Sequence, residues 1–156
     1  MMLKVNDILK NEMVVLKNRG SKQALSDLKN LQAFSKVCEK YKLNEINVNA
    51  SNVNVGVVAI ELMKKILKND YVSNIYDHNH ENIYKVNNKY FQFGSYVISK
   101  PALTRENNKP FEKVLILVHS NTNKGIYSLE KEKVLNLNKR LSISDIVNNG
   151  RKVLDF

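Results

Sequence analysis

The sequence predicts an α+β fold, because helical periodicity dominates its first part and strand patterns dominate the rest. Residues 1–70 contain three stretches whose apolar side chains recur at helical spacing, with one short alternating segment among them. Beyond residue 70, segments rich in Tyr, Val, Ile and Phe are separated by polar turns. Helices around a βαββ unit, followed by a β-rich half, therefore make up the expected class.

The N-terminal part predicts two amphipathic helices. The first covers residues 5–18, where apolar side chains lie near helical spacing and Arg19-Gly20 is a typical stop. Ser21 is a suitable N-cap for the second helix, because its hydroxyl can accept a hydrogen bond from the first turn. The apolar stripe of this second helix consists of Leu25, Leu28, Leu31, Phe34, Cys38 and Tyr41.

A short strand and a third helix follow. Apolar and polar residues alternate over residues 46–50, as in a half-buried strand. Ser51 or Asn52 is placed to cap a helix over residues 54–69, with its apolar stripe inward and its lysines outward. This strand and helix start the expected βαββ unit.

The second half predicts strands that are joined by polar loops. The expected short strands cover residues 71–77, 82–87, 89–99, 141–146 and 152–156. Lys113–His119 is apolar almost throughout, so we expect it to be buried on both faces. A polar loop over residues 120–124 is closed by Gly125, and residues 126–135 form a mixed segment that can include a short helix.

The composition favours a polyanionic partner. The chain has 25 Lys and Arg against 15 Asp and Glu, a net charge of +10, and cations near phosphates release condensed counterions on binding. Since no apolar run approaches the length that spans a bilayer, nucleic acid is favoured over membrane. The single cysteine, Cys38, excludes an internal disulfide and is expected to be a buried apolar residue in a reducing compartment.

Candidate catalytic and metal sites are sparse. His78 and His80 have a spacing that would put both rings on one face of a strand, but no further Cys or His cluster follows, which favours a polar hairpin turn. His119 has no obvious Ser or Cys partner for nucleophilic catalysis. We therefore expect no catalytic residue, no bound metal and no cofactor.

A small metal-dependent nuclease is the main enzymatic alternative. Glu61 on a helix, Asp77 on a strand and Gln92 on a later strand resemble a degenerate restriction-nuclease core. Such a core needs an acidic residue and a lysine, typically Glu-x-Lys, around a metal that activates water. The corresponding slot here is Gln92-Phe93-Gly94, which lacks the lysine. A phage or plasmid DNA-binding protein is a further alternative.

Several stretches, in order along the chain, resemble one family. Residues 46–53 and the following helix, which ends in Ile66-Leu67-Lys68, are similar to a strand-and-helix unit of the small-subunit ribosomal protein eight family. Residues 98–103 resemble its isoleucine-serine-lysine-proline-glycine-leucine motif, and residues 121–126 resemble its serine-threonine-serine-lysine-glycine loop. Ser26-Asp27-Leu28 fits the opening helix of the family, so the resemblance covers residues 21–145.

The departures from the family lie mostly in the C-terminal half. Asn121 and Asn123 stand where the family has serines, and the glycine-leucine-glycine before the last apolar strand is missing. The abundance of Asn and Lys indicates AT-rich codons. A divergent organellar member is therefore expected, in a mitochondrial ribosome rather than in a plastid or in the bacterial cytoplasm.

The resemblance implies a two-lobe protein that binds the central domain of small-subunit ribosomal RNA and supports its assembly. Its expected parts are a helical extension over residues 1–20, an N-terminal αβαββ lobe over residues 21–95 and a C-terminal β-rich lobe over residues 96–156. The extension carries one apolar face, which must pack either on its own domain or on a neighbouring ribosomal protein.

The same resemblance gives the candidate RNA-binding residues. Short polar side chains next to a glycine let the backbone approach a sugar-phosphate edge, and amides and hydroxyls suit 2′-hydroxyl groups. Lysines beside these loops would supply charge. The candidates are Asn121, Thr122, Asn123, Lys124, Gly125, Ser99, Lys100, Pro101, Ser51, Lys29 and Asn30.

Overall fold

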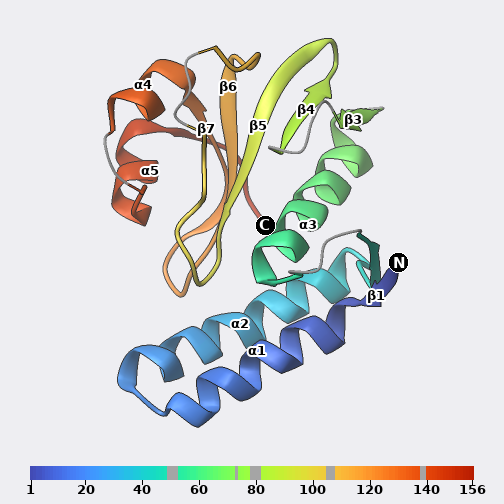
Figure 1. Ribbon diagram of the computed structural model, residues 1–156, viewed down its shortest axis with the longest axis vertical. Helices are drawn as coiled ribbons and strands as arrows, with labels where there is room; N and C mark the ends of the chain where they lie inside the picture. Colours follow the sequence, from blue (N-terminus) through green and yellow to red (C-terminus); the bar gives the residue numbers. More distant parts are fainter. Residues whose placement is uncertain (49–52, 73, 78–81, 105–107, 138–139) are drawn as a thin grey trace.

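A mixed sheet of six strands forms the centre of the molecule (Figure 1). The computed structural model describes residues 1–48, 53–72, 74–77, 82–104, 108–137 and 140–156. Neighbouring strands are antiparallel except for β5 and β6, which are parallel. The strands follow one another in space as β3 (Ile75–Asp77), β4 (Ile83–Val86), β5 (Lys89–Tyr96), β6 (Lys113–His119), β7 (Lys124–Glu130) and β8 (Arg151–Leu154).

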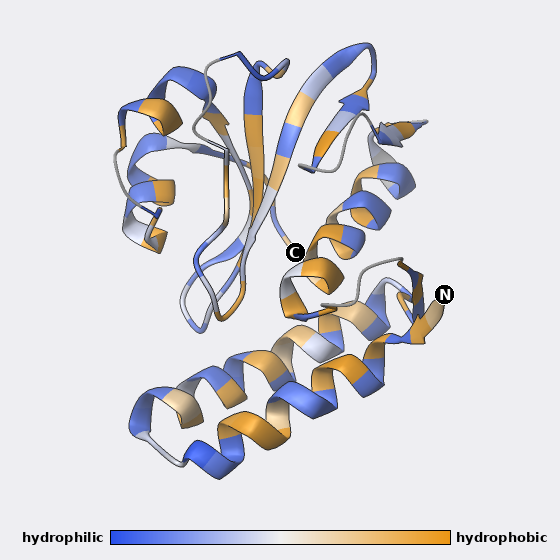
Figure 2. Ribbon diagram, viewed as in Figure 1, coloured by the Kyte–Doolittle hydropathy of each residue, from blue (hydrophilic) through white to orange (hydrophobic). Residues whose placement is uncertain are grey.

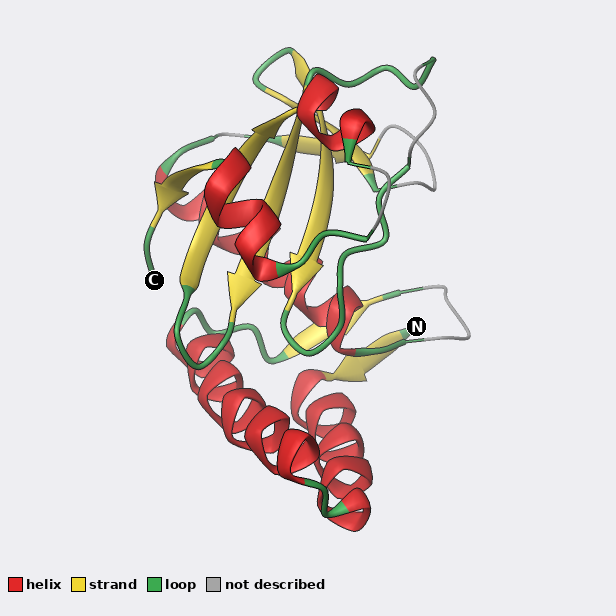
Figure 3. Ribbon diagram, turned by 90° about the vertical axis from the view of Figure 1, so that its left-hand side faces the viewer, coloured by secondary structure: helices red, strands yellow, loops and turns green. Residues whose placement is uncertain are grey.

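Helices cover both faces of this sheet, so the molecule has three layers (Figures 1 and 3). On one side, α3 (Val55–Asp70) packs on β5 and β6, and the hairpin of α1 (Val5–Arg19) and α2 (Lys22–Lys40) lies below it. On the other side, α4 (Lys131–Asn136) and α5 (Ile143–Asn149) pack on β7. The architecture confirms the predicted α+β class and the additional N-terminal helix.

Each face of the sheet has its own hydrophobic core. The larger core joins α1, α2 and α3 to the sheet, and the smaller one lies under α4 and α5. Leu115 and Leu117 of β6 belong to the larger core, while its Val114, Ile116 and Val118 belong to the smaller one. Figure 2 shows β6 as an apolar strand at the centre. The prediction that this strand is buried on both faces is therefore confirmed.

The helix starts were predicted well, apart from one cap. Ser21 accepts a hydrogen bond from the backbone N–H of Ala24 at 3.1 Å, as expected for the cap of α2. The cap of α3 is Asn54, whose Oδ1 accepts from the N–H of Val57 at 3.1 Å. The expected caps Ser51 and Asn52 were therefore wrong, because a cap reaches only two or three residues ahead; both also lie outside the described residues.

The C-terminal part contains more helix than predicted. Residues 141–146 were expected to form a strand, but α5 begins there with a capping box in which Ser142 and Asp145 bond to each other's backbone N–H groups at 3.1 and 2.9 Å. The mixed segment after Gly125 divides into β7 and α4. The expected final strand is confirmed as β8.

The sheet continues across the expected boundary between the two lobes. That boundary, after residue 95, falls inside β5, which pairs with β6 over six register positions from Phe91↔Lys113 to Tyr96↔Val118. The strand before α3, β2 (Glu45–Asn47), pairs with β1 (Met2–Lys4) and forms a separate two-stranded sheet. The expected βαββ unit therefore does not form within one sheet, because β1 from the N-terminal extension is the partner of β2.

The N-terminal extension packs on its own chain. Val5, Leu9 and Leu16 are each at most 2 % exposed and belong to the larger core. Val14 and Val15 lie outside this buried stripe of α1 and are exposed. No helix in the described ranges is both long and apolar enough to cross a bilayer.

Candidate nucleic-acid interface

The carboxyl ends of β5 and β6 meet at one edge of the sheet, because these two strands are parallel. Residues 97–100 leave this edge after β5, and residues 120–124 leave it after β6. We call these two segments, with the part of α2 that packs on them, the carboxyl edge (Figure 1). Ligands of open sheets commonly bind beyond the carboxyl ends of parallel strands. Both motifs that carried the family resemblance in this half therefore lie at one edge.

A buried amide ties the carboxyl edge to α2. Nδ2 of Asn30 donates to the carbonyl oxygens of Val97 and His119, at 2.8 Å each, and its Oδ1 lies 2.7 Å from Nδ1 of His119. Asn30 is only 3 % exposed. Its expected role in RNA contact is therefore corrected to a structural one, because all of its polar atoms bond within the protein.

The turn over residues 120–123 is held by its own hydrogen bonds. Oγ of Ser120 accepts from the N–H groups of Thr122 and Asn123 at 3.3 and 2.9 Å, and the N–H of Ser120 donates to the Asn123 carbonyl at 2.8 Å. Nδ2 of Asn121 donates to the carbonyl and the hydroxyl of Ser26 on α2 at 3.2 and 3.1 Å. These hydrogen bonds hold the turn in one conformation and fix it against α2.

Two candidate residues shape the backbone instead of facing solvent. A Cβ on Gly125 would stand 2.6 Å from the Leu154 carbonyl oxygen, so this glycine lets β8 approach β7. Pro101 is buried, and its Cβ lies 3.3 Å from where a Cβ on Gly94 would be. Since both residues are buried, the expected direct contacts of Gly125 and Pro101 with RNA at this edge are corrected to a structural role.

Six of the candidate residues are exposed at the carboxyl edge. Lys29 lies on α2 between Ser26 and Asn30, which both bond to this edge. Asn123 is half-buried and Ser51 lies outside the described residues. The exposed candidates are Lys29, Ser99, Lys100, Asn121, Thr122 and Lys124.

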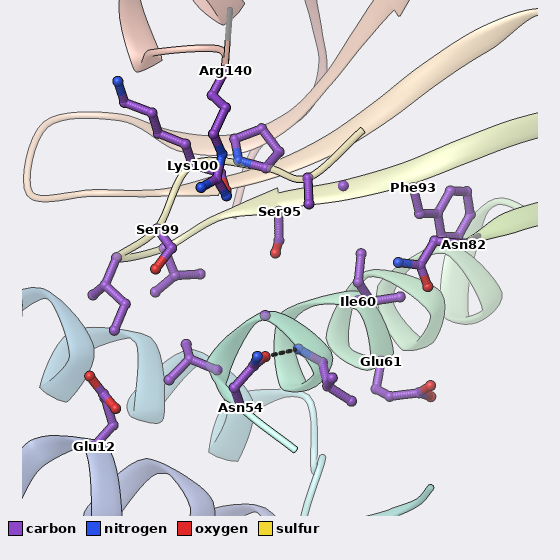
Figure 4. Close-up of a pocket in the computed structure, with 18 of the residues that line it drawn as sticks. Glu12, Asn54, Ile60, Glu61, Asn82, Phe93, Ser95, Ser99, Lys100 and Arg140 are labelled. Carbon is purple, nitrogen blue, oxygen red and sulfur yellow. Dashed lines mark hydrogen bonds between the residues drawn. The ribbon is translucent and has the colours of Figure 1, made fainter. Parts of the chain in front are cut away.

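A cavity of about 500 Å³ lies beside the carboxyl edge, between α3 and β5 (Figure 4). Ser99, Lys100 and Pro101 line it, so three of the predicted residues share this wall. Arg140 lines the same end and donates from Nη2 to the Lys100 carbonyl at 2.9 Å. Sequence reasoning missed Asn54, Ser95 and Arg140, because only the fold brings them together.

Of the residues of the nuclease alternative, Asp77 lies on the same side of the sheet as Glu61, since it is in register with Tyr84 of the larger core, and Gln92 lies on the opposite side. Gln92 is in register with Ile83 and Val114, which belong to the core under α4 and α5. Glu61 lies on α3, on the opposite side, where it pairs with Lys64 at 3.0 Å. The expected grouping of Glu61 with Gln92 was therefore wrong, since successive side chains of a strand point to opposite faces.

The cavity-facing positions of β5 are Phe93 and Ser95. The Glu and Lys of a Glu-x-Lys motif would occupy two such positions, i and i+2, on one face of a strand. In β5 these two positions hold a phenyl ring and a hydroxyl group. His78, His80 and Glu81 lie outside the described residues. The described residues contain no group of three or more His, Cys, Asp or Glu that could hold a metal ion.

Two buried groups have strongly shifted pKa values. Burial raises the pKa of the Cys38 thiol to about 12, in accord with its expected role as a buried apolar residue. Burial, with a smaller contribution from Lys124, lowers the pKa of His119 to about 4. At neutral pH His119 is therefore uncharged, and its Nδ1–H donates to Asn30 while its ring packs edge-on against Phe34 at 5.4 Å.

We expect the fold to lose stability as the pH falls from about 6.5 to about 4, because the unfolded chain binds a proton at His119 in this window and the folded chain does not. The contribution of this group amounts to about 3 kcal/mol at most. Urea unfolding across this pH range, compared between the wild type and His119→Gln, isolates it. Equal pH slopes for the two proteins would contradict the assignment.

Comparison of the chain with protein-family models, curated proteins and solved structures finds no match. The geometry of the carboxyl edge and the positive charge of the chain are the properties that bear on its function.

Proposed function

We propose that this protein is a non-enzymatic RNA-binding protein and that it binds RNA at the carboxyl edge of β5 and β6. The observation that carries the proposal is the convergence at this edge of two segments far apart in sequence, residues 97–100 and 120–124. Both present exposed lysines and short polar side chains.

The physical chemistry of this edge suits RNA. Lys29, Lys100 and Lys124 are exposed cations on three different segments, in a chain of net charge +10. Thr122 and Ser99 offer hydroxyl groups that can both donate to and accept from a 2′-hydroxyl group. Because Asn30 and the turn hydrogen bonds hold the segments in place, little conformational entropy is lost on binding.

We propose that the protein acts in the small ribosomal subunit. Support comes from the ordered resemblance over residues 98–126 to the small-subunit ribosomal protein eight family, and the cognate RNA is then the central domain of the small-subunit ribosomal RNA. An organellar, mitochondrial ribosome fits the AT-rich codon bias. The exposed Val14 and Val15 of α1 are where a neighbouring ribosomal protein would pack.

Replacing Lys29, Lys100 and Lys124 together by Gln is expected to weaken binding to a central-domain RNA fragment. Each lost phosphate contact lowers the magnitude of the salt slope of log K by about 0.7 to 0.9, so three lost contacts should lower it by about 2 to 3. Fluorescence anisotropy with the full chain at several salt concentrations measures both quantities. Duplex DNA of equal length serves as the competing polyanion.

A matched variant separates the edge from general charge. Lys10→Gln, Lys68→Gln and Lys89→Gln together remove the same charge from exposed lysines on α1, on α3 and at the opposite end of β5. This control should keep most of the affinity. If both triple variants lose affinity equally, or if duplex DNA binds as tightly as the RNA, the proposed interface is refuted.

Two further measurements address the assembly and the enzymatic alternative. Native purification should recover the protein with small ribosomal subunits in a sucrose gradient. Incubation with RNA or DNA and Mg²⁺ or Mn²⁺ should leave the nucleic acid intact. If the wild type cleaves the nucleic acid and Glu61→Gln does not, the protein is a nuclease and the proposed function is refuted.

A further inference from the structure

We propose that the cavity between α3 and β5 binds a single nucleotide, with its base inside and its phosphate at Arg140. This inference rests on the proposed RNA-binding function, and it names the part of the RNA that the cavity takes. The cavity adjoins the carboxyl edge through residues 97–102, which line its wall. A strand of RNA on this edge could therefore turn one nucleotide into it.

The size and lining of the cavity suit a base. Its volume of about 500 Å³ lies within the usual range for small-ligand sites, and its lining combines apolar and polar groups. Val57, Ile98 and Ala102 supply accessible apolar surface to the cavity, and the buried Ile60, Phe93 and Val97 lie behind it. Sequence-specific RNA recognition commonly uses unstacked bases that are held in this way.

Three polar groups of the cavity are available to a ligand. Among the described residues, the hydroxyls of Ser95 and Ser99 and the Nδ2 of Asn54 have no hydrogen-bond partner, although all three residues line the cavity. In Figure 4, Ser95 points across the cavity toward Asn54 at the start of α3. These hydroxyl and amide groups can read the polar edge of a base.

A glycine keeps this wall open. A Cβ on Gly56 would stand 3.1 Å from Oδ1 of Asn54 and 3.6 Å from Oγ of Ser95. A larger side chain at this position would therefore extend between α3 and β5 and fill the cavity. Gly56 has an ordinary helical φ, so the added Cβ strains no backbone dihedral, but it also crowds the Oδ1 of the Asn54 cap. Urea unfolding of Gly56→Leu is therefore measured beside its binding.

The charges of the cavity are separated in a way that suits a phosphate at one end. The guanidinium of Arg140 lies at this end, where it donates to the Lys100 backbone carbonyl, while the Lys100 side chain extends away from the cavity. Glu61 is neutralised by Lys64 at 3.0 Å, and Glu12 lies on α1, away from the cationic end (Figure 4). A phosphate beside Arg140 gains charge-assisted hydrogen bonds.

The test uses the full chain, labelled with ¹⁵N, and uridine 5′-monophosphate, uridine and inorganic phosphate as separate probes. The monophosphate should shift the amide resonances of Gly56, Ser95 and Ser99, and uridine should shift them at higher concentration. Gly56→Leu should abolish these shifts and weaken binding of a short oligouridylate roughly tenfold, a loss of about 1.4 kcal/mol. Arg140→Gln, a change at an exposed side chain, should weaken the binding of the monophosphate but leave the binding of uridine unchanged.

The outcomes separate this inference from the proposed function. If Gly56→Leu binds the oligouridylate like the wild type while Lys124→Gln binds it weakly, the cavity is refuted and the RNA interface stands. If the monophosphate binds but no RNA does, the RNA function fails and a free nucleotide is the ligand. If inorganic phosphate alone reproduces all shifts, the cavity is an anion site and the nucleotide inference is overturned.

Discussion

Asn30→Ala is expected to lower the free energy of unfolding by about 3 kcal/mol, because it removes three buried hydrogen bonds at about 1 kcal/mol each. These bonds join α2 to Val97, at the end of β5, and to His119, at the end of β6. Their loss leaves buried polar groups without partners and frees α2 from the carboxyl edge. Urea unfolding followed by circular dichroism measures the change.

Two companion variants make this expectation specific. Gln32→Ala, at an exposed position on the same helix, should change stability by less than about 0.5 kcal/mol. Asn30→Asp retains an acceptor for His119 but cannot donate to the two carbonyl groups, so it should also be destabilised. Wild-type stability in Asn30→Asp would show that the two donated bonds contribute little.

Gly125→Ala is the second substitution for which we expect a large effect, a destabilisation of roughly 2 to 4 kcal/mol. The added Cβ would meet the Leu154 carbonyl oxygen at 2.6 Å, and the φ of +157° is rarely adopted by other residues. β8 must then move away from β7. The stacking of Phe156 on His119, at 6.1 Å between ring centroids, should weaken with it.

Gly20→Ala is the matched control for backbone strain without a clash. Gly20 also has a positive φ, +66°, but a Cβ there would be 3.9 Å from the nearest atom outside its immediate neighbours. Its loss should cost only about 1 kcal/mol. Thermal unfolding of both variants compares them, and equal losses would contradict the role of Gly125 in seating β8.

Much of the fold could be predicted from local patterns. The periodicity of residues 5–18, the Ser21 cap and the apolar run of β6 are local signals, and each has its expected counterpart in the structure. The capping box of Ser142 and Asp145 is also a local signal, but the strand interpretation of residues 141–146 overlooked it. Helix caps therefore deserve more weight than short apolar patterns in this chain.

The site was predictable only in part, because it depends on pairing between distant segments. Nothing in residues 89–96 indicates that their neighbour in the sheet is a parallel strand after a crossover. Without that pairing, Asn30 resembles an exposed polar residue beside Lys29. Its spacing of four residues before the buried Phe34 was the available sign that it lies on the inner stripe of α2.

The parallel pairing of β5 and β6 also makes the two halves of the chain depend on each other during folding. A hairpin can close a pair of antiparallel strands locally, whereas a parallel pair needs a crossover, here residues 97–112, and such non-local pairing is slow to form. Until β6 pairs with β5 during folding, the unpaired edge of β5 is open to pairing with strands of other chains. Neither half is therefore expected to be a stable, soluble unit when it is produced alone.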